Sequence, residues 1–156
     1  MKFFILALCV ATVAADWLSA DEAGVLQAHW AGVKNDKEGI LAAVFTANPD
    51  IQAKFPQFAG QDVASLKGTG PFTAHANSIV GLLDTYIGLL GNDGNAGKIT
   101  AALDKMAGTH KPRGVTVAQL NGFKKAAVSY VKASGAAEKA YNAAFDAFIA
   151  YVGPKL

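Results

Sequence analysis

Cysteine is almost absent from this sequence, since Cys9 is the only one among 156 residues. No intramolecular disulfide can form, which excludes the small secreted scaffolds that cystine bridges hold together. Cys9 lies in an apolar run, Phe3–Val13, that follows Lys2 and is itself followed by small residues. This order is typical of a secretory signal peptide, so we expect residues 1–15 to be removed and residues 16–156 to form the mature protein.

The sequence also lacks a large excess of either positive or negative charge. The whole chain carries a net charge of +2, and loss of Lys2 with the leader would bring it closer to neutrality. A nucleic-acid partner requires a basic face, so we expect none. Beyond the leader no stretch is long and apolar enough to span a membrane, and a leader retained as a short anchor is the less favoured alternative. A secreted domain without disulfides must be stabilised by packing or by a cofactor buried in its core.

Strand patterns are lacking as well, and apolar residues recur at helical spacing throughout the mature chain. Helices are expected to begin near the following positions, most of which carry capping residues or proline: Ser19–Glu22, Asn35–Glu38, Asn48-Pro49, Asp62, Pro71, Lys98, Thr116–Gln119 and Ser134-Gly135. The first, second and seventh of these have the form of a capping box. We therefore predict one all-helical (all-α) domain with six main helices plus short ones.

The end of one predicted helix is fixed by a proline. His110 is followed by Lys111-Pro112, and proline disfavours the helical conformation of its predecessor. Leu103 and Met106 precede His110 by seven and four positions and therefore share its face. An imidazole held at a rigid helix end on an apolar face suits an axial metal ligand. The alternative is a structural histidine that caps the helix and interacts with its dipole.

A second histidine lies on the apolar stripe of the long helix expected after Pro71. His75 is the only ionisable residue on that stripe, and a buried imidazole must be neutral and either find a polar partner or face a cavity. Phe55 and Phe58 stand in a segment that breaks the helical periodicity, and they form either a satellite of the core or the wall of a ligand cavity. Two histidines are too few for a bare zinc ion, whereas haem needs only axial ligands from the protein.

Three segments together resemble the extracellular haemoglobins of midge larvae, which are globins. They are Phe55–Gly60, Lys67–Asn77 and Thr109–Thr116, and they match in order, with the helix breaks in the expected places. The resemblance covers the chain from about Leu18 to its end and includes the leader. It implies the globin fold, a three-over-three helical sandwich around haem b, and a secreted protein of extracellular fluid (haemolymph).

The resemblance also implies roles for residues around the haem. His110 would be the proximal iron ligand and His75 the distal histidine, which donates a hydrogen bond to bound O₂. Phe55 would stack on the ring, Ile79 would lie one turn after His75, and Leu41 would cover the distal pocket. We expect a set of apolar side chains to keep water from the iron: Leu41, Phe55, Phe58, Ile79, Met106 and Val115.

Two departures from the midge proteins concern the surroundings of this pocket. Ser78 stands where those relatives often carry arginine, and the segment between the two histidines is longer, with the surplus expected in the loop Gly91–Gly97. Arg113 and Lys111 are candidates for pairing with haem propionates, although a solvated cluster at a helix end is the commoner role of such residues.

The two histidines and the resemblance together predict a haem protein that binds O₂ reversibly and is not an enzyme. The resemblance also implies that it binds CO and NO and is a monomer or homodimer. The same iron could serve a haem-dependent oxidoreductase, either an NO dioxygenase or a peroxidase-like enzyme. Peroxidase chemistry generally needs a polar acid–base pair on the distal side, where only His75 is evident. A secreted helical carrier of hydrophobic ligands is the remaining alternative, which the lack of cysteine disfavours because such carriers resemble disulfide scaffolds.

Overall fold

The computed structural model describes residues 17–156, so the signal peptide predicted for residues 1–15 lies outside the described residues. All regular structure between Trp17 and Leu156 is helical. The long helices are α1 (Ala20–Val33), α2 (Lys37–Ala47), α5 (Gly70–Leu89), α6 (Ala96–His110), α7 (Val117–Tyr130) and α8 (Gly135–Val152). The short segments are α3 (Pro49–Gln52), α4 (Val63–Leu66) and 3₁₀ turns at Asp93–Asn95, Lys111–Arg113 and Gly153–Lys155. The prediction of six main helices plus short ones is confirmed.

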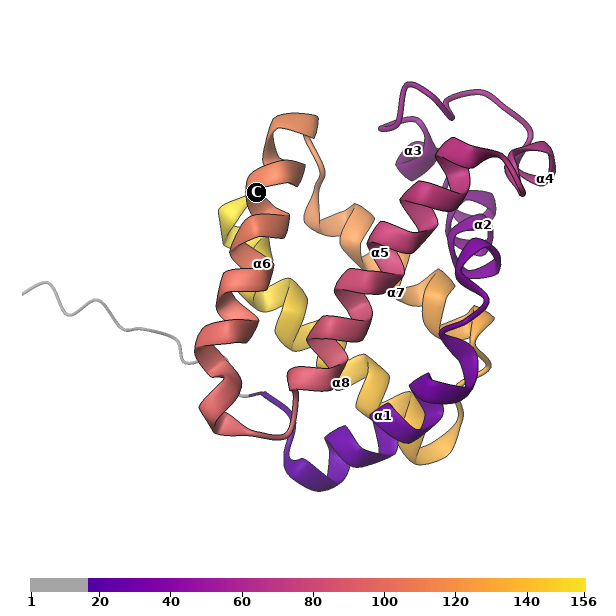
Figure 1. Ribbon diagram of the computed structural model, residues 1–156. Coiled ribbons are helices and arrows are strands. Elements are labelled where there is room, and N and C mark those ends of the chain that lie inside the picture. The colour runs from indigo at the N-terminus through magenta and orange to yellow at the C-terminus, as the bar shows by residue number, and fades with distance from the viewer. Residues whose placement is uncertain (1–16) are drawn as a thin grey trace, which may run out of the picture.

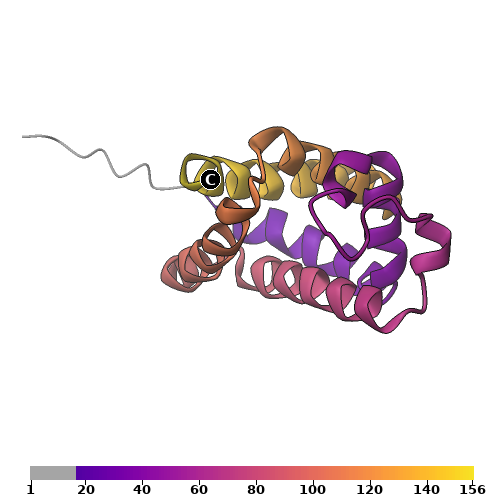
Figure 2. The ribbon, with the colours of Figure 1, turned by 90° about the horizontal axis from the view of Figure 1, so that it is seen from above.

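The helices are arranged in two layers (Figures 1 and 2). Helices α1, α5 and α6 form one layer and α2, α7 and α8 the other, which is the three-over-three arrangement that the resemblance implies. Across the layers α1 packs on α8, while α2 packs on both α5 and its neighbour α7. The inward faces meet in one apolar core, in which several side chains have no exposed surface: Leu26, Val44, Phe72, Leu103 and Val152. No helix within residues 17–156 combines the length and apolar character that a membrane crossing requires.

Capping residues begin several helices as predicted. The capping boxes at Ser19–Glu22 and Thr116–Gln119 are both present, with side chain and backbone bonded in each direction. Asn48 behaves differently from the prediction, because its side chain makes no capping bond to α3. Its amide instead donates to the carbonyl oxygens of Val44, at 3.0 Å, and Gly122, at 3.3 Å, and so joins α2 to α7.

The capping box predicted at Asn35–Glu38 is wrong. The capping residue of α2 is Asp36, whose carboxylate accepts a backbone N–H of the first turn. Glu38 is therefore available for a contact between distant segments. Its carboxylate accepts the N–H of Gly68 at 2.9 Å and the hydroxyl of Thr73, which fastens the loop before α5 onto α2. A local pattern cannot reveal such a partner, since Gly68 and Thr73 are brought close only by the fold.

The start of α6 also differs by two residues from the prediction. A 3₁₀ turn at Asp93–Asn95 leads directly into α6, which begins at Ala96 instead of near Lys98. The turn forms because the side chain of Asn92 accepts the N–H of Gly94 at 2.9 Å. The segment Gly91–Gly97, predicted as a loop, is thus partly helical.

Gly91 occupies a position where any other residue would have a strained backbone and no space for its side chain. Its φ is +80°, and an added Cβ would lie 2.7 Å from the Cβ of Ala23 and 3.2 Å from the Cα of Ala20 in α1. We expect Gly91→Ala to lower the free energy of unfolding by about 2–4 kcal/mol, because backbone strain adds to overlap with α1.

Gly68→Ala is the matched control for this prediction. Gly68 has a φ of +79°, yet nothing lies within 4 Å of an added Cβ. It should therefore lose only the cost of the left-handed backbone, about 1–2 kcal/mol. Denaturant unfolding of both variants measures the difference, and equal losses would show that the close approach to α1 has no energetic weight.

Candidate functional site

A cavity of about 400 Å³ lies where α5, α6 and the segment after α3 meet the second layer. Seven of the eight residues predicted for a haem pocket line it: Leu41, Phe55, His75, Ile79, Met106, His110 and Val115. The eighth, Phe58, does not line the cavity. It is only 1% exposed and packs behind Phe55, with 6.1 Å between the ring centroids, so it supports the wall from outside.

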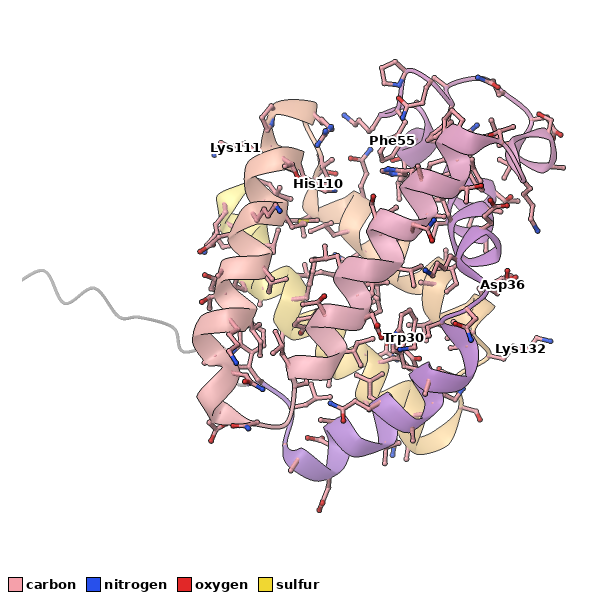
Figure 3. All side chains as sticks on the ribbon, in the orientation of Figure 1. Trp30, Asp36, Phe55, His110, Lys111 and Lys132 are labelled. Carbon is pink, nitrogen blue, oxygen red and sulfur yellow. The ribbon has the colours of Figure 1, made fainter. Side chains whose placement is uncertain are left out.

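His110 enters the cavity from the last turn of α6 (Figure 3). Its Nδ1 lies 2.8 Å from the backbone oxygen of Met106 and 3.0 Å from the hydroxyl of Thr109. A carbonyl oxygen can only accept, so Nδ1 carries the proton and donates a hydrogen bond to the oxygen of Met106. The lone pair of Nε2 is therefore available. Burial, aided by the charge of Arg113, lowers the pKa of His110 below its ordinary 6.5, while the bond to Met106 acts in the opposite direction. The imidazole is thus held in the neutral form that binds metals.

The chain reverses direction immediately after His110. Pro112 lies in the 3₁₀ turn Lys111–Arg113, and Gly114, at a φ of +63°, closes that turn. The N–H of Val115 then returns to the carbonyl of His110 at 3.3 Å, and its side chain borders the cavity. The helix end predicted from the proline is confirmed.

His75 faces the same cavity from α5. Its Nε2 is buried and has no hydrogen-bond partner in the part of the chain that the structure describes. The imidazole packs on Phe55, with 4.4 Å between ring centroids, and lies 5.9 Å from the ring of Phe58. Burial is the main cause that lowers the pKa of His75 below 6.5, and the positive potential of His110 and Arg113 adds to it. A buried polar atom without a partner costs about 1–3 kcal/mol, unless a ligand in the cavity supplies one.

Two cationic residues stand among the residues that line the cavity. Arg113 was a sequence candidate, whereas Lys54 was not, although it precedes Phe55 directly. The ammonium of Lys54 donates to the carbonyl of Gly114 at 2.8 Å and so links the segment after α3 to the turn after α6, beside the cavity. Lys111, the other sequence candidate, is absent from the lining and points away from Phe55 and His110 in Figure 3.

Ser78 also lines the cavity, but its hydroxyl bonds to its own helix. Its Oγ donates to the carbonyl of Ala74 at 3.0 Å. The position where midge relatives often carry arginine therefore offers no cation here, and Lys54 and Arg113 are the charged groups that remain along the lining. No residue of the loop Gly91–Gly97 lines the cavity.

Helices α7 and α8 contribute a further side of the cavity, which the predicted set of eight pocket residues does not include. The residues are Leu120, Phe123, Phe145, Phe148 and Ile149. Their helical spacing predicts that they face inward. Which inward residues border a cavity depends on how the two layers meet, and no local signal carries that information.

The remaining histidine, His29, is remote from the cavity. It packs edge-on against Tyr141 between α1 and α8, with its Nδ1 at 3.3 Å from the hydroxyl. Among residues 17–156 no group of three or more histidine, cysteine, aspartate or glutamate side chains is placed to hold a bare metal ion. Two neutral imidazoles on apolar walls instead fit a planar macrocycle that carries its own equatorial nitrogens. The fold and the cavity thus define a class of helical proteins that enclose such a group between two helices.

Comparison with known proteins identifies the family. The globin family model matches residues 38–156, and the chain belongs to the globin family. Globin CTT-VIIB-3 of Chironomus thummi thummi is 47% identical over the full length of both chains, and globin CTT-VIIB-4 of the same organism is 52% identical over 84% of this chain and 82% of its own.

Solved structures agree with this assignment. A haemoglobin component (TA-VII) from Tokunagayusurika akamusi matches with a TM-score of 0.85 at 32% identity, over 90% of this chain and 98% of that chain. A ferric myoglobin of Aplysia limacina matches with a TM-score of 0.75 at 26% identity, over 86% of this chain and 96% of that one. The resemblance to midge globins is confirmed, and membership of the family implies a haem cofactor.

Proposed function

We propose that this protein binds O₂ reversibly at a haem b held in the cavity and serves oxygen transport or storage in extracellular fluid. The observation that carries the proposal is the buried, unpartnered Nε2 of His75, which borders the same cavity as the neutral imidazole of His110. Proteins of the globin family bind O₂ and other small gases, and several relatives are named globins or haemoglobins. When bound, the haem supplies the iron at which a small gas attaches and leaves without chemical change.

His110 would hold the iron through Nε2. The hydrogen bond from its Nδ1 to the carbonyl of Met106 fixes the tautomer and the plane of the ring, as second-shell partners do for metal-binding histidines. The apolar lining would enclose the ring, and exclusion of water by Leu41, Phe55 and Ile79 would slow oxidation of the iron. Lys54 and Arg113 are the cations placed to pair with the carboxylates of the ring.

His75 would donate a hydrogen bond from Nε2 to O₂ lodged in the cavity. Since burial keeps its pKa low, the imidazole is neutral and can carry its proton on that nitrogen. In a water-poor cavity such a bond contributes about 1–1.5 kcal/mol, roughly tenfold in affinity. O₂ gains more negative charge on binding than CO does, so the bond would favour O₂ selectively.

A comparison of rates distinguishes this proposal from the enzymatic alternatives. We expect reversible O₂ binding with measurable dissociation and a peroxidase turnover no greater than that of free haemin. Stopped-flow O₂ dissociation and peroxide-dependent dye oxidation, measured on one preparation, provide the test. A turnover far above that of free haemin would favour an oxidoreductase, and rapid loss of O₂ on addition of NO would favour a dioxygenase.

We also propose that residues 1–15 are a signal peptide and that the protein is secreted. Processing after Ala15 would leave Asp16 as the first residue of the mature chain. Expression in a secreting eukaryotic cell, with N-terminal sequencing of the protein in the medium, is the test. Retention in the cell with an intact Met1 would contradict secretion.

We expect O₂ dissociation to accelerate as the pH falls. The pKa of His75 lies below the ordinary 6.5 because the cavity disfavours the charged ring. The inward, neutral state is therefore fully present above pH 6.5 and is lost as the pH falls through the lowered pKa, when the charged imidazole prefers water. Stopped-flow O₂ dissociation from about pH 8 to about pH 5 measures the effect. A rate that stays constant over this range would contradict the movement of His75 out of the cavity.

A further inference from the structure

The C-terminal turn of the chain lies beside α6, the helix that carries His110 (Figures 1 and 2). The ammonium of Lys155 pairs with the carboxylate of Asp104 on α6 and sits 3.6 Å above the ring of Tyr151. The hydroxyl of Tyr151 donates to the same carboxylate at 3.1 Å. The ammonium of Lys111 donates to the backbone oxygen of Lys155 at 3.3 Å. We refer to Asp104, Lys111, Tyr151 and Lys155 as the C-terminal clamp.

The clamp includes one residue on each side of His110 along the chain, the first on α6 and the second in the 3₁₀ turn that follows it. Asp104 precedes the histidine by six residues, and Lys111 follows it directly. Tyr151 is itself braced by Trp17, with 6.0 Å between the ring centroids, and Trp17 also packs edge-on against Tyr86 of α5. Tyr151 therefore connects Asp104 on α6 to Trp17 at the start of the described chain.

The opposite surface of this helix end has less protein to hold it. The main long-helix neighbours of α6 are α5 and α8. At its C-terminal end, Met106, Thr109 and His110 all border the cavity, and Met106 also packs against the apolar core. The cavity therefore replaces part of the packing on the inner side of this helix end, and contacts on its outer side contribute to its position. None of the clamp residues lines the cavity, so they can act on a ligand there only indirectly, through the elements that they hold together.

We propose that the C-terminal clamp positions His110 by holding the end of α6, and that it thereby sets the strength of the bond from His110 to iron. This inference rests on the proposed function, because it requires His110 to be the iron ligand. The ion pair at its centre is partly exposed, with relative side-chain accessibility of 38% for Lys155 and 53% for Asp104. Salt screens such pairs, because the Debye length is about 3 Å at 1 M ionic strength. The C-terminal clamp should therefore weaken as the salt concentration rises.

The test compares Lys155→Met and Asp104→Asn with Lys124→Met. Lys124 and Asp146 form another partly exposed ion pair, at 2.6 Å, but it joins α7 to α8 and does not contact α6. The first readout is amide hydrogen exchange over Leu103–His110, measured with and without haem. The second is the Fe–His stretching frequency of the ferrous, haem-loaded protein by resonance Raman spectroscopy.

Loss of the clamp is expected to accelerate exchange in Leu103–His110 on the order of threefold to tenfold and to shift the Fe–His frequency. Lys124→Met should change neither, and 1 M NaCl should move the wild-type values toward those of Lys155→Met. Unchanged exchange in both clamp variants would overturn the clamp itself. Faster exchange with an unchanged Fe–His frequency would overturn the positioning of His110.

The two proposals fail in different ways. An Fe–His band missing from the wild-type protein would contradict the proposed function and, with it, the action of the clamp on iron. A wild-type band that is present and identical in all variants would leave the proposed function intact and overturn this inference alone.

Discussion

Replacement of His110 by alanine is expected to abolish stoichiometric haem binding. The variant loses the only imidazole whose second nitrogen is anchored to a helix carbonyl at the cavity, the bond from Nδ1 to Met106. Loss of a second-shell partner alone typically costs 10–100-fold in metal affinity, so loss of the ligand itself should cost at least about 100-fold. Haemin titration followed by absorbance measures the change, and circular dichroism checks that the helices remain.

Two further variants control for general damage to the pocket. His29→Gln removes a histidine that packs on Tyr141 away from the cavity, and it should retain full haem content. Thr109→Val removes the hydroxyl at 3.0 Å from Nδ1 but keeps the Met106 carbonyl, so it should weaken haem binding only slightly. Added imidazole should restore haem to His110→Gly. A haem-loaded His110→Ala protein with an unchanged spectrum would refute the role of this residue.

Replacement of His75 by leucine is expected to change ligand binding and stability in opposite directions. Dissociation of O₂ should accelerate roughly tenfold, while CO dissociation changes much less, because the hydrogen bond to the ligand is lost. The haem-free protein should become more stable, by up to about 1–3 kcal/mol, because leucine removes a buried nitrogen that has no partner within residues 17–156. Stopped-flow kinetics and denaturant unfolding measure the two effects.

This opposition distinguishes a ligand-binding histidine from a structural one. If His75 served only the core, its removal would destabilise the haem-free chain and leave O₂ dissociation unchanged. Thr85→Ala is a suitable control on the same helix, because the Thr85 hydroxyl is exposed and bonds only to the carbonyl of Gly81, at 2.9 Å. That variant should match the wild type in both measurements.

The parts of the fold that follow from local chemistry could be predicted from sequence. Proline at position 112 ends α6 at His110, and the boxes Ser19–Glu22 and Thr116–Gln119 begin α1 and α7. Each of these signals acts within a few residues, so no knowledge of the fold is needed to interpret it. The two histidines stood out for a similar reason, since polar residues on apolar faces are conspicuous in any helical pattern.

The parts that depend on distant segments could not be predicted. Glu38 looked like a capping residue because its partners, Gly68 and Thr73, are adjacent only after folding. Phe55 and Phe58 are equivalent in the sequence pattern, yet only Phe55 borders the cavity, because the turn between them places Phe58 behind it. The place of Lys54 could not be predicted for the same reason, since its contact with Gly114 joins segments that are 60 residues apart in the chain.

Titration of the haem-free protein with haemin, followed by reduction and exposure to CO, tests the central claim most directly. A cavity with a neutral imidazole on each of two facing elements predicts saturation at one haem per chain and a ferrous spectrum that shifts with CO or O₂ and returns when the gas is removed. A protein that remains colourless, or that takes up haemin without a saturating end point, would contradict it.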